Sequence, residues 1–110
     1  MTSEQSFVDF IVDQMEAAGG ITSRKMFGEY AIYSGEKLIA LVCDNKLFVK
    51  PTAAGREFIG DVIEAAPYAG AKSSFLIEDK FEDRDWIASL ARITADELPE
   101  PKPKVKKTKK

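Results

Sequence analysis

The sequence contains no histidine and a single cysteine, Cys43, among its 110 residues. Without histidine the chain lacks the commonest general base and the commonest metal ligand of proteins. Ser-His-Asp and Cys-His catalytic groups are therefore excluded, and so is an ordinary zinc site. The seven glycines match neither the dinucleotide-binding nor the phosphate-loop spacing. We therefore expect no catalytic residue, no metal and no cofactor, and we predict that the protein is not an enzyme.

Long apolar runs are also absent, because no stretch approaches the roughly 18 residues that a membrane-spanning helix needs. The first ten residues, MTSEQSFVDF, are acidic and amphipathic, unlike the charged start and apolar middle of a secretory signal. A lone cysteine cannot form an internal disulfide, and this favours a reducing compartment. We therefore expect a cytoplasmic protein with no membrane partner.

Positive charge is unevenly distributed along the chain. Six lysines and no acid lie in the last nine residues: Lys102, Lys104, Lys106, Lys107, Lys109 and Lys110. The rest of the chain has ten cationic residues against eighteen acidic ones, a net charge of −8. Proline and lysine alternate at the start of this segment and leave little to bury. We therefore predict one folded domain, residues 1–98, followed by a disordered Pro/Lys-rich basic tail, residues 99–110.

Periodicity and turn residues predict an α+β domain. Apolar residues at helical spacing, after a cap at Thr2 or Ser3, indicate a first helix that ends at Gly19-Gly20. Asp44-Asn45 has the composition of a two-residue hairpin turn. Strand-like runs cover residues 21–27, 29–33, 38–43, 46–50 and 73–78, and further helices cover residues 53–65 and the segment from about residue 83. The expected fold is an antiparallel four- to five-stranded sheet flanked by three helices.

The run LIALVC, Leu38 to Cys43, is apolar at successive positions, whereas a strand with one face in water alternates. We therefore predict a central strand with other groups packed on both of its faces. Three helices can cover one face of such a sheet, so the other face needs a different cover. A second copy of the chain, in a symmetric homodimer, is one candidate. The loop APYAGAKSS, residues 66–74, together with the second helix, is the other.

Three further groups of residues have both a functional and a structural interpretation. The acid-rich run EDKFEDRD, residues 78–85, could hold a divalent cation, but carboxylates also favour the start of a helix, and no glycine provides the turn of a calcium loop. Cys43 could sense redox state, but no cation lies beside it, so a small buried side chain is expected. Four aromatic residues could form a base-stacking surface, but the domain is acidic and core packing is favoured: Phe27, Tyr30, Tyr33 and Phe48.

The densest pattern in the chain is RKMFGEYAIYSGEKLIALVCDNKLFVKP, residues 24–51. It resembles the start of the TfoX N-terminal domain family, which is named for bacterial regulators of competence. The head of the family pattern, Arg-x-Met-Phe-Gly-x-Tyr, is matched by Arg24, Met26, Phe27, Gly28 and Tyr30. The resemblance extends from the first helix to about Ala91, and it implies a compact α+β domain with an antiparallel sheet flanked by helices. It carries no catalytic residue over to this chain.

The head of the pattern also has a purely structural interpretation. Gly28 lies between two strand-like runs and indicates a bulge or tight bend, since glycine takes positive φ freely. Arg24 and Lys25 could touch an anionic ligand, although two cations at a strand start are usually solvated, and Arg24 could pair with an acid across the sheet. We interpret the segment as a frame with any binding site on its rim: Arg24, Lys25, Met26, Phe27, Gly28 and Tyr30.

Two functions from different classes remain open. The first is a non-catalytic regulatory or protein-interaction module of the TfoX type, which binds an unknown protein partner through an apolar edge or face of its sheet. The second is a nucleic-acid-associated accessory protein that contacts polyanions weakly through its lysine tail. Salt dependence separates the two, because a complex held by the tail weakens steeply as the salt concentration rises.

Overall fold

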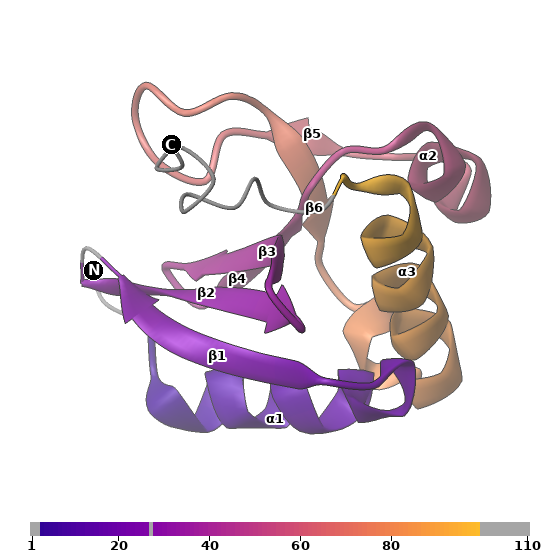
Figure 1. The fold of residues 1–110 in the computed structure, drawn as a ribbon. Coiled ribbons are helices and arrows are strands. Elements are labelled where there is room, and N and C mark those ends of the chain that lie inside the picture. The colour runs from indigo at the N-terminus through magenta and orange to yellow at the C-terminus, as the bar shows by residue number, and fades with distance from the viewer. Residues whose placement is uncertain (1–2, 27, 100–110) are drawn as a thin grey trace, which may run out of the picture.

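The computed structural model describes residues 3–26 and 28–99 of the chain. Within these residues the chain forms three α-helices and six strands (Figure 1). The helices are α1 (Gln5–Met15), α2 (Ala53–Ile59) and α3 (Arg84–Glu97). The strands are β1 (Ile21–Met26), β2 (Glu29–Ser34), β3 (Lys37–Cys43), β4 (Lys46–Val49), β5 (Glu64–Ala65) and β6 (Ser74–Ile77). The predicted α+β class is confirmed.

The strands form one antiparallel sheet in the order β1-β2-β3-β4-β6-β5. β3, which was predicted to be central, lies between β2 and β4. The expectation of four to five strands missed β5, which pairs with β6 through Glu64 opposite Phe75 and Ala65 opposite Ser74. A strand of two residues is too short to produce an alternating pattern, so no periodic signal marks it in the sequence.

Two helix boundaries differ from the sequence-based expectation. The helix predicted over residues 53–65 stops just before Gly60, whose φ of 86° is a conformation that ends helices and favours glycine. The predicted cap at the start of α1 is also wrong for Ser3, because the N-cap residue is Glu4. The Ser3 hydroxyl instead accepts a hydrogen bond from the backbone N–H of Asn45 at 2.9 Å. A contact across the fold has therefore replaced the local cap.

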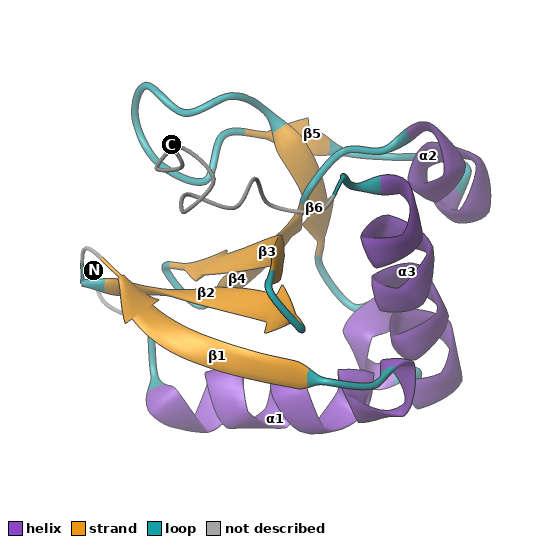
Figure 2. Ribbon diagram, in the orientation of Figure 1, coloured by secondary structure: helices purple, strands orange, loops and turns teal. Residues whose placement is uncertain are grey.

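One face of the sheet carries most of the core. The register places Tyr30, Val42, Leu47 and Ile77 side by side on it, and we call it the covered face. α1 runs along this side and α3 packs next to it (Figure 2). The helices contribute fully or nearly fully buried side chains to the same cluster: Val8, Ile11, Met15, Ile87, Leu90 and Ala91. Removal of this apolar surface from water is the main force that stabilises the domain.

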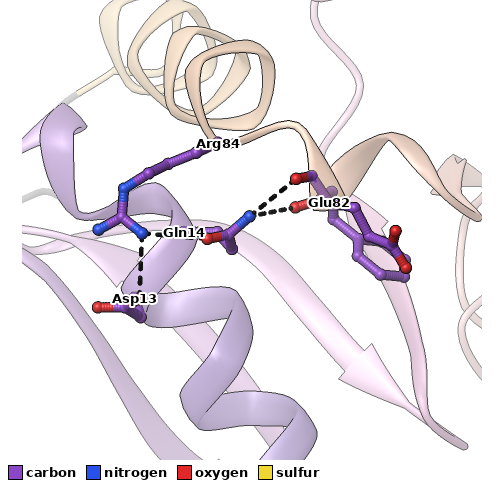
Figure 3. Close-up of polar contacts among 5 residues, drawn as sticks. Asp13, Gln14, Glu82 and Arg84 are labelled. Carbon is purple, nitrogen blue, oxygen red and sulfur yellow. Dashed lines mark hydrogen bonds and ion pairs between the residues drawn. The ribbon is translucent and has the colours of Figure 1, made fainter.

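Gln14 is a buried polar side chain between the two helices that cover this face (Figure 3). Its amide nitrogen donates hydrogen bonds to the carbonyl oxygens of Phe81 and Glu82, at 3.0 and 3.2 Å. Its amide oxygen accepts a hydrogen bond from Arg84 at 3.1 Å, and Arg84 also reaches the carboxylate of Asp13 at 3.1 Å. A buried amide needs such partners, and this set joins α1 to the start of α3.

Two tight hairpins shape one end of the sheet. Asp44 and Asn45 connect β3 to β4 with φ values of 54° and 57°, as the predicted two-residue turn requires. Gly28 lies in the turn between β1 and β2 with a φ of 81°. The tight bend predicted at Gly28 is therefore confirmed, and both turns lie at the same end of the strands.

Two sequence-based expectations concern other parts of the chain. No helix in residues 3–26 or 28–99 has the length and apolar character that crossing a membrane requires. The six tail lysines, Lys102 to Lys110, lie outside the described residues, as does Thr2, the other residue considered as a helix cap.

Candidate functional site

The second face of the sheet has a lighter cover than the first. Ala31, Leu41, Phe48 and Leu76 are neighbours on it, and we call it the open face. Ala31 and Phe48 are buried, whereas Leu41 and Leu76 are half-buried. In Figure 1, α1 lies below β1 and β2, while the loop of residues 66–73 between β5 and β6 lies above β2, β3 and β4. A loop, not a helix, therefore faces this side of the sheet.

A groove of about 610 Å³ lies between the open face and the 66–73 loop. Its strand side is formed mainly by the apolar side chains of Met26, Leu38 and Leu41, and its loop side by Pro67 and Tyr68. Tyr68 is 61% exposed, an unusual position for a large aromatic side chain. The volume falls in the range of natural ligand sites and is large enough for one or two apolar side chains of a peptide.

Glu29 lies at the hairpin end of the groove. Its two carboxylate oxygens accept backbone hydrogen bonds from Ser3 at 2.9 Å and from Asp44 at 3.0 Å. Burial opposes ionisation of this carboxyl, but hydrogen bonds from the Ser3 hydroxyl and from the two N–H groups outweigh it and lower the pKa of Glu29. Glu29 is therefore negatively charged at neutral pH, and it fastens the N-terminal segment to the β3–β4 hairpin.

Asp44 supplies a second carboxylate at the same end of the groove. Its side chain is 60% exposed, and the ammonium nitrogen of Lys46 is 3.8 Å from one of its oxygens. That separation exceeds a hydrogen bond, and an exposed ion pair of this kind stabilises little. Among the described residues that line the groove, none is a lysine or arginine. The groove therefore combines an apolar floor with an acidic end.

Cys43 also lines the groove but is poorly placed for thiol chemistry. It is 6% exposed, and its pKa is raised by burial first and then by the negative charges of Glu29 and Asp44. Because the thiolate is the reactive form of cysteine, this environment suppresses its reactivity. The prediction that Cys43 is a small buried side chain is confirmed.

The two cations of the motif do not line the groove. Arg24 and Lys25 are both exposed on β1. The guanidinium of Arg24 lies over the ring of Tyr33, 5.3 Å from its centroid, and the ammonium of Lys25 lies 5.9 Å from the centroid of Tyr30. Pairing with an acid across the sheet was one of the alternatives for Arg24, and the structure places its guanidinium over a tyrosine ring. Such cation–π contacts stabilise an exposed site by about 0.5–1 kcal/mol.

Other motif residues do reach the groove. Met26 and Tyr30 both border it, although Tyr30 also belongs to the core of the covered face. Gly28 forms the turn that brings their strands together. Phe27 lies outside the described residues. The interpretation of the motif as a frame with any binding site on its rim stays a prediction, and of the six residues named for it Met26 and Tyr30 border this groove.

Several residues of the groove were not among the predicted site residues: Glu29, Leu38, Leu41, Asp44, Pro67 and Tyr68. They come from separate segments that only the sheet register and the loop bring together. The sequence did indicate one part of the groove, because the loop APYAGAKSS is one of the covers expected for this face of the sheet. The other part of that idea was wrong, because α2 packs against α3, where the rings of Phe58 and Trp86 are 5.3 Å apart.

The remaining candidates have structural roles among the described residues. The side chain of Asp83, in the acid-rich run, caps α3 by accepting a hydrogen bond from the Trp86 N–H at 3.2 Å. Tyr30 and Phe48 are buried, so core packing is confirmed for these two members of the aromatic set. Tyr33 is half-buried beneath Arg24. The homodimer stays a prediction.

Known proteins share the sequence pattern of this domain. The TfoX N-terminal domain matches residues 13–98, which is most of the chain. This chain belongs to the TfoX N-terminal domain family. The resemblance drawn from residues 24–51 is therefore confirmed, and the groove described above lies within the matched region.

A relative from Spirochaeta aurantia is similar over nearly its whole length. It is 41% identical over 109 residues, which cover 99% of this chain and 95% of the relative. Its description reads "Uncharacterized 12.7 kDa protein in trpE 5′ region". The two proteins are therefore similar in sequence and in size, and the printed description names no activity.

Proposed function

We propose that this chain is a non-catalytic, cytoplasmic protein-interaction module of the TfoX type, which regulates a partner by binding one of its apolar segments in the open-face groove. The observation that carries the proposal is the groove itself. Apolar side chains of β1 and β3 remain partly accessible there, beneath a loop that presents the exposed ring of Tyr68. Concave sites that are lined mainly by apolar side chains, with a few polar groups at one end, are typical of binding pockets.

The composition of the groove suits a peptide segment. Leu38 and Leu41 offer half-buried aliphatic surface, and Tyr68 offers a large ring with a polar end. Aromatic residues are enriched among those that dominate binding energy in protein interfaces. An apolar side chain of a partner that fills the space between sheet and loop removes surface from water on both sides of the contact.

The ionisable groups of the groove support a binding role. A general acid or base works best with a pKa near the operating pH. The pKa of Glu29 is lowered, and that of Cys43 is raised, so both move away from neutrality. Both oxygens of Glu29 already accept hydrogen bonds from the fold. Both groups are therefore poorly suited to acid–base catalysis, and Glu29 also holds the fold together at the end of the groove.

A capture experiment with matched variants tests the proposal. Tyr68→Ala removes the exposed ring of the groove, whereas Phe10→Ala removes a 40%-exposed ring on α1, on the other side of the sheet. Tagged wild-type protein and both variants are incubated with a lysate of the source cell, and retained proteins are quantified. We expect one protein that is retained by the wild type and Phe10→Ala and is reduced at least about tenfold by Tyr68→Ala. Equal retention by all three proteins contradicts the proposal.

The lysine tail supports a second candidate function, that of an accessory protein bound to nucleic acid. Six lysines without an acid in nine residues are the observation that favours it. The same capture is repeated with a chain in which the six lysines are replaced by glutamine, and with increasing salt. Polyanion binding through the tail is favoured if a partner is lost both from the glutamine chain and from the wild type at high salt. The same partner should still be retained by Tyr68→Ala.

A further inference from the structure

We infer that the groove is an interaction surface for a lysine-bearing extended segment, and that residues 100–110 of the same chain are its resident occupant. The inference rests on the proposed function, because it treats the groove as a docking surface. It adds that a partner must displace the chain's own tail. Three features of the molecule support it: the charge of the groove, the place where α3 ends, and the length of the tail.

Charge complementarity is the first argument. The groove ends in the carboxylates of Glu29 and Asp44, and none of its described lining residues is cationic. The domain around it is acidic, since residues outside the lysine run have a net charge of −8. The tail is the opposite, with six lysines and a single aliphatic residue, Val105, between Lys104 and Lys106. An apolar groove with an acidic end suits a short apolar side chain flanked by cations.

The position of the end of α3 is the second argument. Glu97 accepts hydrogen bonds from the backbone N–H groups of Ala53 and Ala54, at 2.9 Å each, and these fix the last turn of α3 to the start of α2. The ammonium of Lys37 donates to the carbonyl oxygen of Ala95 at 2.7 Å. Lys37 directly precedes Leu38, which lines the groove. In Figure 1 the yellow end of α3 lies above β1, β2, β3 and β4, as the 66–73 loop does.

The length of the tail is the third argument. Eleven residues in an extended conformation reach about 36 Å. The strand that forms the floor runs from Leu38 to Asp44, a distance of about 20 Å at 3.3 Å per residue. The tail is therefore long enough to pass from the end of α3 along the groove to its acidic end. An attachment this short also gives an effective concentration on the order of millimolar, so a contact with a dissociation constant of about 1 mM is formed in about half of the molecules.

Methyl NMR on the full-length chain tests this inference. Spectra of the wild type are compared with those of a chain of equal length in which the six tail lysines are glutamines. Met26 and Leu41 report on the groove, and Met15 and Leu47, both buried on the covered face, serve as internal controls. At about 0.01 M salt we expect different methyl shifts at Met26 and Leu41 in the two chains and equal shifts at the controls. Near 1 M salt the difference should vanish, since the screening length falls from about 30 to about 3 Å.

A second pair of variants tests the acidic end. Asp44→Asn keeps a residue that tolerates positive φ, and Glu57→Gln removes an exposed charge on α2 away from the groove. We expect Asp44→Asn to reduce the low-salt shift difference at Met26 and Leu41 by about half or more, and Glu57→Gln to leave it unchanged.

Two results overturn the inference. The first is identical groove signals in the wild type and the glutamine chain at low salt. The second is groove signals that move with protein concentration equally in both chains, because a second copy then occupies the groove. Neither result affects the proposed function, which depends on the loss of a captured partner in Tyr68→Ala. A tail contact found without any such partner would instead leave the inference standing and remove the proposed function.

Discussion

The two faces of the sheet are both apolar in sequence, yet they are used differently. On the covered face, Val42 and Leu47 are fully buried beneath α1 and α3. On the open face, Leu41 is half-buried, and the neighbouring loop presents a tyrosine that is 61% exposed. The run LIALVC supplies side chains to both faces, so its composition alone could not distinguish them. The distinction comes from what packs on each face, two helices or one loop.

A matched pair of leucine substitutions is expected to give the largest difference between the faces. Leu47→Ala removes a fully buried side chain from the covered face and should lower the free energy of unfolding by about 2–5 kcal/mol. Leu41→Ala removes a half-buried side chain from the open face and should lower the free energy of unfolding by about 1 kcal/mol. Urea unfolding of both variants measures this. Equal losses would mean that the open face is packed as completely as the covered one.

The β1–β2 turn, which sets the rim of the open face, is expected to show the next largest effect. Gly28→Val places a β-branched residue at a φ of 81° and should lower the free energy of unfolding by about 1–3 kcal/mol. A Cβ at Gly28 meets nothing within 4 Å, so the loss arises from backbone strain and not from a clash. Gly28→Asn is the control and should cost less, since asparagine tolerates positive φ. Thermal melting compares the stability of the two variants. Equal stability of the valine and asparagine variants would show that a β-branched residue causes no backbone strain at position 28.

Glu29 gives the open face a modest pH dependence. Its pKa in the folded protein lies below the ordinary value of 4.5, so its contribution to stability is fully present above pH 4.5. The contribution is lost as the pH falls through the lowered pKa. The gap in unfolding free energy between the wild type and Glu29→Gln should therefore narrow on acidification below pH 4.5. Urea unfolding from pH 7 to pH 3 measures the gap, and one that widens towards low pH would contradict this sign.

The smallest effect on stability is expected from the tail. Deletion of residues 100–110 should change the free energy of unfolding by no more than about 0.5 kcal/mol, because proline and lysine bury little apolar surface. Melting curves of the full and shortened chains provide the comparison. A loss of several kcal/mol would show that the tail belongs to the folded domain and would remove the boundary placed near residue 98.

The sequence predicted local features better than long-range ones. The hairpin turn at Asp44-Asn45 and the bend at Gly28 were recognised because turn residues act through their own backbone conformation. The helix predicted to residue 65 ended early, because a single residue, Gly60, outweighed the helical pattern. The groove could be anticipated only in part. Leu41 and Tyr68 are 27 positions apart, and no local pattern connects them.

The most direct test of the account is methyl shift mapping of the full-length protein against the partner recovered by capture. The central claim is that the covered face stabilises the fold and the open face binds. The account predicts that signals of Met26, Leu38 and Leu41 shift on binding, while those of Met15 and Leu47 stay in place. Groove signals that remain unchanged in a saturated complex, with shifts located on the helices instead, would contradict it.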